Sequence, residues 1–346
     1  MRVLIDIGHP GHVHLFRHFA HLFIGKGNSV LFTARTKEHE AELLKSAGLP
    51  FVMLGKHYSS FFGKIWGMVR YNIQIFFISL RFRPDIFLSH GSLYTLLAAT
   101  VKRRPNIALE DSGNPEQVRL YLPFTAAVLT STSFPYDYGR KQIRYRGYHE
   151  LAYLHPNYFS ADQSVVNELG LNPGEKYFIM RLVGWKASHD RSHSGLTADQ
   201  TQQIVDYLSD RGKVFISSEL RLPPSLEQYR FPLDPSRMHH ALAFATLFVG
   251  EGATMASESA VLGTAAIYVN TIRRGYLEEQ ERDYGLVSCF RNFDGVMERI
   301  TELLNRPDLK SETKKSSQRL INDKCDVTRF LVQFIEDYPY GATKVR

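Results

Sequence analysis

Short runs of β-branched and other apolar residues alternate with stretches of helical periodicity, and this alternation constrains the fold more than any other feature of the sequence. In the first part of the chain these runs fall at 3–7, 29–34, 51–54, 86–89, 107–109 and 127–130. After the first run, Leu15, Phe19 and Phe23 recur on one helical face before glycines at 25 and 27. Strand, helix and strand in succession form the βαβ unit, which predicts a parallel sheet covered by helices.

The alternation stops around residues 145–160 and then resumes, which indicates a second domain of the same kind. Its predicted strands fall at 177–180, 214–217, 247–250 and 266–270, and helical patterns follow at 294–305, 311–321 and 328–337. A chain of 346 residues also exceeds what one compact core usually holds. We therefore predict an α/β protein of two doubly wound, Rossmann-like domains facing a central cleft. The expected boundaries are 1–155, 156–322 and a final helical segment, 323–346, that packs back on the first domain.

Composition excludes several classes of protein. The chain is 44% hydrophobic and 22% charged, as expected of a globular protein with a large core. Cys289 and Cys325 are its only cysteines, and their separation fits neither a disulfide framework nor a zinc site. The apolar run at 1–7 is too short for a signal peptide. We expect a cytoplasmic protein, and peripheral attachment to the inner face of the membrane stays open.

The net charge of +7 calls for an anionic partner. It favours a phosphate-bearing ligand or an anionic membrane surface. Neither zinc-finger spacing nor a basic helix occurs, so we do not expect nucleic acid as a partner.

The loop after the first predicted strand is rich in glycine and histidine. Gly8 and Gly11 allow a tight turn close to a ligand, and His9, His12 and His14 surround them. A histidine at a helix start beside a cleft can remove a proton from a sugar hydroxyl, and we choose His12 for that role. The alternative is that these histidines cap and pack the first helix. Their spacing matches no strong metal motif, so no metal site is predicted.

The loop and helix at 250–263 form the second candidate site. Small residues let backbone N–H groups approach an anion at the helix start, where the helix dipole also favours negative charge. The residues expected to bind a diphosphate in this way are Gly252, Ala253, Thr254 and Met255. Glu258 lies four residues after Thr254 and is placed to accept the hydroxyl protons of a ribose. The alternative is a small-residue turn that only allows close packing of helix on sheet.

A third loop follows the first strand of the second domain. It contains Arg181, Lys186 and His189, which are suited to neutralising the charge of a departing diphosphate. Ser218, at the end of the next strand, is a further candidate for phosphate contact. An ordinary polar surface loop is the alternative.

Carboxylates complete the set of candidates. Asp111 follows the fifth predicted strand. It is suited to acid–base catalysis, or to capping the next helix, whose start Asn114 and Pro115 indicate. We favour capping there. Glu251 precedes the anion-binding helix, where a carboxylate is unfavourable unless it points away or takes part in catalysis. In the polar run at 145–150, Arg146, His149 and Glu150 either reach the cleft or form a hinge, and we favour the hinge.

On these residues the chain resembles known families. The segment 250–262 looks like the donor-nucleotide loop of glycosyltransferase-B enzymes, whose glutamate on this helix binds the ribose, which implies that role for Glu258. Residues 11–13 resemble a loop of the enzyme that transfers N-acetylglucosamine to lipid-linked muramyl peptide, where the histidine is a candidate base, as His12 would be here. Nearly the whole chain is similar to the domain-of-unknown-function family 354, most recognisably at 5–14, 146–156, 181–190 and 250–262. Glu251 departs from the small residue expected at its position.

The resemblance implies a glycosyltransferase-B fold and a nucleotide-sugar diphosphate as ligand. No Asp-x-Asp triplet occurs, so we expect neither an essential metal nor another cofactor. Six residues separate Glu251 from Glu258, one fewer than in many retaining enzymes of this class, which favours inversion. The expected function is sugar transfer to a saccharide or lipid-linked acceptor in cell-surface polysaccharide or glycolipid synthesis. A nucleotide-sugar 2-epimerase of the UDP-N-acetylglucosamine type, or a non-catalytic sugar-nucleotide-binding protein, are the alternatives.

Overall fold

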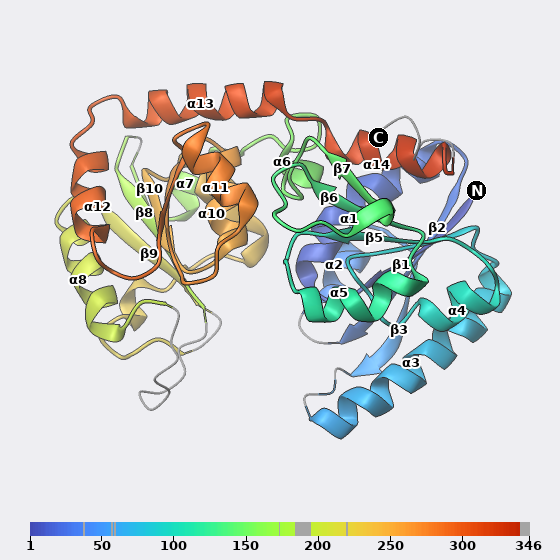
Figure 1. The fold of residues 1–346 in the computed structure, drawn as a ribbon. Helices are drawn as coiled ribbons and strands as arrows, with labels where there is room; N and C mark the ends of the chain where they lie inside the picture. Colours follow the sequence, from blue (N-terminus) through green and yellow to red (C-terminus); the bar gives the residue numbers. More distant parts are fainter. Residues whose placement is uncertain are drawn as a thin grey trace. The chain divides into compact units, whose positions relative to one another are not determined.

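The computed structural model consists of two compact α/β units (Figure 1). It describes residues 1–36, 39–56, 58, 60–172, 174–183, 195–218 and 221–339. Unit 1 comprises Met1–Tyr158 together with the chain from Cys325 onward, and unit 2 is Phe159–Lys324. The predicted boundaries at 155/156 and 322/323 lie within a few residues of these divisions.

Unit 1 is built on a seven-stranded, wholly parallel sheet in the order β3-β2-β1-β4-β5-β6-β7. Its strands are β1 (Arg2–Ile7), β2 (Ser29–Thr36), β3 (Phe51–Lys56), β4 (Ile86–Ser89), β5 (Asn106–Glu110), β6 (Ala127–Ser131) and β7 (Gln142–Tyr145). Its helices are α1 (Pro10–Gly25), α2 (Glu40–Ser46), α3 (Phe61–Phe82), α4 (Leu96–Val101), α5 (Pro115–Tyr121), α6 (Leu151–Leu154) and α14 (Val327–Glu336). The strand order reverses between β1 and β4, and ligands of such sheets bind at that switch point, beyond the carboxyl ends of the strands.

Unit 2 has a five-stranded parallel sheet in the order β12-β11-β10-β8-β9. Its strands are β8 (Tyr177–Leu182), β9 (Lys213–Ser218), β10 (Leu247–Gly250), β11 (Ala265–Val269) and β12 (Val287–Phe290). Its helices are α7 (Ser164–Glu168), α8 (Ala198–Ser209), α9 (Met238–Phe244), α10 (Ala253–Val261), α11 (Gly275–Arg282), α12 (Val296–Leu304) and α13 (Leu309–Asp323). The order reverses between β8 and β10, which puts the loops after these two strands at the second switch point.

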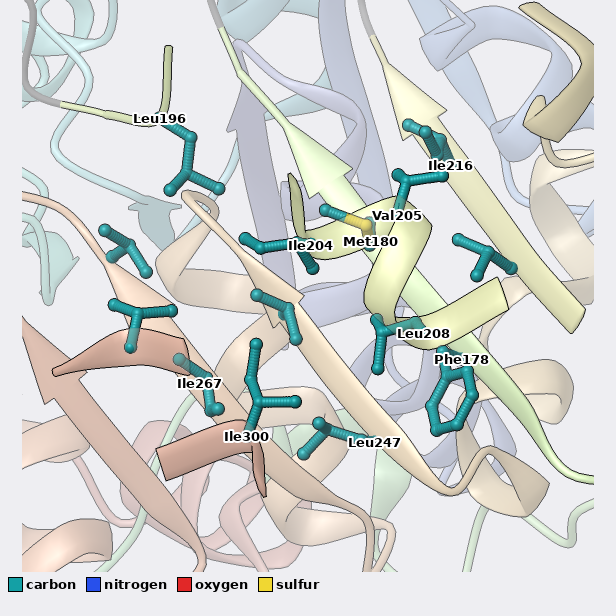
Figure 2. Close-up of a cluster of buried hydrophobic side chains, with 14 of the residues drawn as sticks. Phe178, Met180, Leu196, Ile204, Val205, Leu208, Ile216, Leu247, Ile267 and Ile300 are labelled. Carbon is teal, nitrogen blue, oxygen red and sulfur yellow. The ribbon is translucent and has the colours of Figure 1, made fainter. Parts of the chain in front are cut away.

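The core of unit 2 explains how its sheet and helices hold together. One face of α8 presents Ile204, Val205 and Leu208 to Phe178 and Met180 of β8, and all five side chains are buried (Figure 2). Truncating one of these, for example Leu208→Ala, is expected to cost about 2–5 kcal/mol. The rigid sheet in turn fixes the strand ends from which the candidate site residues project.

Two strands escaped sequence-based prediction, β7 and β12. Both are four-residue edge strands, and only Ile143 and Tyr145 of β7 are buried. So short a run, half of it polar, gives a weak periodic signal. The other ten strands lie where the sequence predicted them, with ends that differ by at most two residues. Among the described residues, no helix combines the length and apolarity that crossing a bilayer requires.

Candidate functional site

At the switch point of unit 1 four polar side chains gather at the carboxyl ends of three strands. His12 begins α1 after β1, His90 follows β4, and Asp111 follows β5. The rings of His12 and His90 stack with centroids 4.5 Å apart. His90 Nε2 lies 2.9 Å from Asp111 Oδ1, and His149 Nδ1 lies 3.0 Å from Asp111 Oδ2. We call these four residues the Asp111 cluster.

The charges of this cluster follow from its geometry. Burial of the carboxyl works against its charge, yet the two imidazoles lower the pKa of Asp111 well below its usual range. Burial likewise opposes the charge of His90, but the charge and hydrogen bond of Asp111 prevail and raise the pKa of His90 to about 9. At neutral pH the cluster therefore holds an ionised carboxylate beside an imidazolium.

His12 differs from His90 in its protonation. Burial and the neighbouring charge of His90 lower the pKa of His12 well below its usual range, so this ring is neutral. The backbone N–H of Gly8 donates to its Nδ1 at 3.3 Å, which places the single ring proton on Nε2. His12 thus offers a hydrogen-bond donor at Nε2, while its other ring nitrogen already accepts the N–H of Gly8.

The other histidines of the first loop have different surroundings. His9 caps α1, since its Nδ1 accepts the backbone N–H of Gly11 at 3.1 Å. The ring of His14 lies 5.6 Å from that of Tyr153 in α6, on another face of α1 than His12. His9 therefore caps the first helix and His14 packs against a neighbouring one, as the alternative interpretation of these histidines expected.

A buried ion pair supports the first loop from below. Arg35 Nη1 lies 3.0 Å from both carboxylate oxygens of Asp6, and its Nη2 donates to the carbonyl of Ile7 at 2.8 Å. A Cβ on Gly8 would come within 2.8 Å of the same guanidinium, so only glycine leaves room for it. The buried Asp6–Arg35 ion pair therefore fixes the backbone of the loop that carries His12.

One prediction about this half of the site was wrong. Asp111 does not cap the following helix, because Asn114 does so by accepting the N–H of Gln117. For segment 145–150 a hinge was favoured over contact with the cleft, and its His149 belongs to the Asp111 cluster. His90 was missed as well, since a lone histidine after a short strand carries no motif.

Three members of the cluster also have a metal-ligand composition. Ligand atoms of His90, Asp111 and His149 all lie within 4.8 Å of one another. Direct hydrogen bonds hold these groups together in the structure, and a metal ion would have to displace the proton of His90 because a ligating imidazole must be neutral.

At the switch point of unit 2, the start of α10 is arranged to receive an anion. Its N-cap is Gly252, and the described residues provide no side-chain cap. The first turn of a helix leaves backbone N–H groups without intrahelical partners, here those of Ala253, Thr254 and Met255. Thr254 is exposed, and Gly252 has no side chain to block the approach.

One turn further into α10, Glu258 is buried and fixed in place. His239 Nε2, from α9, lies 2.9 Å from its Oε1. Glu258 is buried, whereas Thr254, one turn nearer the start of α10, is exposed. The site therefore has a buried carboxylate and, one turn away, N–H groups at the exposed helix start. The sequence did not reveal the part of His239 in orienting that carboxylate.

Glu251 has a structural position. Its carboxylate accepts the backbone N–H of Val183 at 2.7 Å and that of Leu196 at 2.5 Å. A Cβ on Gly195 would lie 2.1 Å from Glu251 Oε1, so glycine is required there. The carboxylate thus points toward the residues that flank segment 184–194.

The remaining candidates of unit 2 lie on strand ends or outside the described residues. Arg181, near the end of β8, donates from Nη1 to Ser217 Oγ of β9 at 2.7 Å. Ser218 ends β9 next to it. Lys186 and His189 lie in segment 184–194, outside the described residues.

Two doubly wound units with their polar groups at the switch points define a protein of the glycosyltransferase-B fold, and comparison with solved structures agrees. The UDP co-structure of MnaA from S. aureus matches with a TM-score of 0.68 and 14% identity, covering 99% of this chain and 98% of that one. UDP-GlcNAc 2-epimerase from Neisseria meningitidis bound to UDP-GlcNAc gives 0.64 and 12%, covering 93% and 99%. MurG from Acinetobacter baumannii gives 0.60 and 15%, covering 97% and 99%.

Sequence comparison identifies the family. The chain belongs to the family described as "Protein of unknown function (DUF354)", whose model matches residues 1–274. No curated protein sequence matches the chain. The expected family and fold are thereby confirmed.

Proposed function

We propose that the protein is a glycosyltransferase that moves a sugar from a nucleoside-diphosphate donor to an acceptor hydroxyl with inversion. The observation that carries the proposal is the start of α10, where open backbone N–H groups stand one turn above the buried, His239-bound Glu258. A diphosphate fits the N–H groups, and a ribose fits the carboxylate. This arrangement binds the donor without a divalent metal. The UDP and UDP-GlcNAc in structures of the same fold support a nucleotide sugar as ligand.

Further residues of unit 2 serve the leaving group in this proposal. Thr254 adds a hydroxyl donor at the helix start, and Arg181 supplies positive charge from the end of β8. Preorganised donors and cations stabilise a diphosphate as negative charge develops on it. Lys186 and His189 are proposed to act with Arg181.

On the acceptor side we assign proton removal to Asp111 and hydrogen bonding to His12. Asp111 is ionised at neutral pH and its side chain retains 27% exposure, so it can accept the proton that a hydroxyl releases as it attacks. The neutral His12 carries its proton on Nε2 and is suited to donating a hydrogen bond to a sugar oxygen. This changes the role expected from the sequence, in which His12 was the base.

The proposed step is a single displacement. The acceptor O–H bond breaks as its proton passes to the Asp111 carboxylate, and the oxygen forms a bond to the anomeric carbon. The bond from that carbon to the donor phosphate breaks, and its electron pair leaves with the nucleoside diphosphate. The acceptor is a saccharide or a lipid-linked saccharide of cell-surface polysaccharide or glycolipid synthesis, on the cytoplasmic side.

Thermal-shift screening against UDP, GDP, CMP and dTDP and their sugars tests the donor site, because a ligand of the native state raises the unfolding temperature. We expect one nucleotide to be selected. Donor hydrolysis or transfer to saccharide and polyprenyl-linked acceptors then tests the reaction. Absence of any shift at millimolar nucleotide would refute the donor site.

A second candidate, a nucleotide-sugar 2-epimerase, is favoured by the carboxylate and histidines gathered in the Asp111 cluster, because epimerisation requires one group that takes the C2 proton and another that returns it. NMR of UDP-GlcNAc in D₂O distinguishes the two reactions. An epimerase forms the manno isomer and exchanges C2 hydrogen for deuterium without any acceptor, whereas a transferase does neither. A protein that binds the donor but turns over neither substrate would be a sugar-nucleotide-binding protein.

A further inference from the structure

Helix α3 carries an apolar face that the fold does not bury. Its inner face packs into the core of unit 1, where Tyr71 and Ile75 belong to the same buried cluster as Leu4, Leu54 and Phe87. Its outer face is lined by large apolar residues, with Trp66 61% and Phe77 63% exposed. The helix therefore has one buried and one exposed apolar face.

Most of the exposed side chains form one continuous stripe. At 3.6 residues per turn, six of the eight large apolar side chains exposed on the described part of this helix fall within an arc of roughly 80°, and Ile65 and Met68 lie to one side of it. The stripe consists of Phe62, Trp66, Val69, Ile73, Phe77 and Leu80. A single exposed apolar side chain needs no explanation, but a contiguous stripe of this length marks an interaction surface.

Helix α4 extends the stripe sideways. It lies beside α3 in Figure 1, and Asn72 of α3 joins the two by accepting the N–H of Leu97 at 3.1 Å and donating to the carbonyl of Leu93 at 3.0 Å. Leu97 and Val101 of α4 are exposed. We call the stripe together with these two residues the α3–α4 surface.

The helices of this surface, with the residues that directly follow α4, carry charges of one sign. Residues 61–82 and 96–104 contain six basic side chains and no acidic one. By helical geometry Arg70 and Arg81 line one edge of the stripe, and both are exposed. Directly after Val101 come Lys102, Arg103 and Arg104. Among the described residues, the one carboxylate that forms an ion pair with them is that of Asp85, 4.0 Å from Arg104.

We infer that the α3–α4 surface docks on an anionic lipid bilayer, with α3 lying in the plane of the interface. Apolar side chains on one face of a helix and basic ones along its edge match the two layers of such an interface, acyl chains and anionic headgroups. Tryptophan is the residue that prefers this boundary. A protein partner would need acidic groups around an apolar groove, whereas a second copy would set the same basic edges against each other.

Trp66 is a built-in reporter of this docking, because the chain has only one other tryptophan, Trp185. In the full-length Trp185→Phe protein, we expect Trp66 emission to shift to the blue on adding vesicles of phosphatidylcholine mixed with phosphatidylglycerol. Brominated lipid in those vesicles should quench it. No quenching by brominated lipid would overturn the inference.

Vesicle co-sedimentation with matched variants distinguishes docking through this surface from non-specific adsorption to lipid. Trp66→Ser with Phe77→Ser is expected to lower the partition coefficient about tenfold or more, since each side chain loses its apolar contact with lipid. Arg81→Gln with Arg103→Gln should weaken binding to anionic vesicles and remove much of its salt dependence. Ile272→Ser, an exposed apolar residue of unit 2, is the control and should bind as the wild type does.

Two other results would contradict the inference. Equal binding of the Trp66/Phe77 variant and the wild type would show that another surface meets the lipid. Light scattering that finds a dimer dissociated by the same substitutions, without vesicle binding, would assign the surface to a second copy. Docking is independent of the proposed reaction, because nucleotide-induced thermal shifts of the same preparations report on unit 2 alone.

Discussion

His239 Nε2 lies 2.9 Å from Glu258 Oε1, and this contact holds a buried carboxylate one turn below an open helix start. If Glu258 accepts the ribose hydroxyls, its orientation is part of the donor affinity. We expect Glu258→Ala to abolish the nucleotide-induced thermal shift. Glu258→Gln should weaken binding by about 1.5–3 kcal/mol, the value of a hydrogen bond to a charged group.

His239→Ala should have a smaller effect on nucleotide binding, measured by calorimetry, because it removes only the orienting partner. Glu312→Ala on α13, an exposed carboxylate of the same unit, is the matched control. A Glu258→Ala protein that binds nucleotide as well as the control would exclude the carboxylate from the donor site.

The tautomer of His12 gives a test of its role. Glutamine can donate a hydrogen bond from a position similar to Nε2–H but cannot take up a proton. If His12 is a donor, His12→Gln should retain far more activity than His12→Ala, measured as kcat/KM with saturating nucleotide sugar. Equal loss in the two variants, on the order of 10²–10⁴-fold, would instead restore His12 to the role of base.

The raised pKa of His90 predicts a pH-dependent contribution to stability. Because the pKa is higher in the folded state, at about 9, than the ~6.5 of a free histidine, the contribution is complete below ~6.5 and is lost as the pH rises through 9. The gap in unfolding temperature between wild type and His90→Gln should therefore narrow from pH 6.5 to 9. A gap that does not change over this range would contradict an imidazolium at His90.

Glu251 and Gly195 are expected to behave as one structural unit. Glu251→Ala leaves two backbone N–H groups without their acceptor, at a cost of about 1–3 kcal/mol for each buried one. Gly195→Ala should be similarly destabilising, because its Cβ cannot coexist with the carboxylate. Denaturant unfolding of both single variants and the double variant should show strong non-additivity. A fully stable Glu251→Gln protein that binds nucleotide but has no activity would point to a catalytic carboxylate instead.

Chelation distinguishes the hydrogen-bonded state of the Asp111 cluster from a metal site. We expect EDTA to leave both nucleotide binding and turnover unchanged, as the His90–Asp111 and His149–Asp111 contacts already satisfy the ligand atoms. Activity lost on chelation and recovered with Zn²⁺ would assign a metal to His90, Asp111 and His149.

The sequence predicted the architecture well because its strands are buried on both faces and therefore strongly apolar. It predicted site residues where glycine or small residues accompany them, as at 8–14 and 250–258. It could not show that His90 and His149 meet, because they lie 59 residues apart and come together at Asp111 only through the order of β4, β5, β6 and β7. Nor could it tell that Glu251 binds the N–H groups of Val183 and Leu196, because a backbone partner leaves no pattern in side-chain spacing.

Helix α14 belongs to unit 1, although the whole of unit 2 precedes it in the chain. Leu331 and Ile335 are fully buried, and Thr328 Oγ1 donates to the carbonyl of Ala152 in α6 at 2.8 Å. During synthesis, the apolar surfaces of α1 and α6 that α14 covers stay exposed until unit 2 has been translated and α14 follows. Unit 1 therefore completes its folding after unit 2, although its sequence begins first. A truncation after Lys324 would leave the apolar surfaces of α1 and α6 exposed, as they are during synthesis, for chaperones and proteases to recognise.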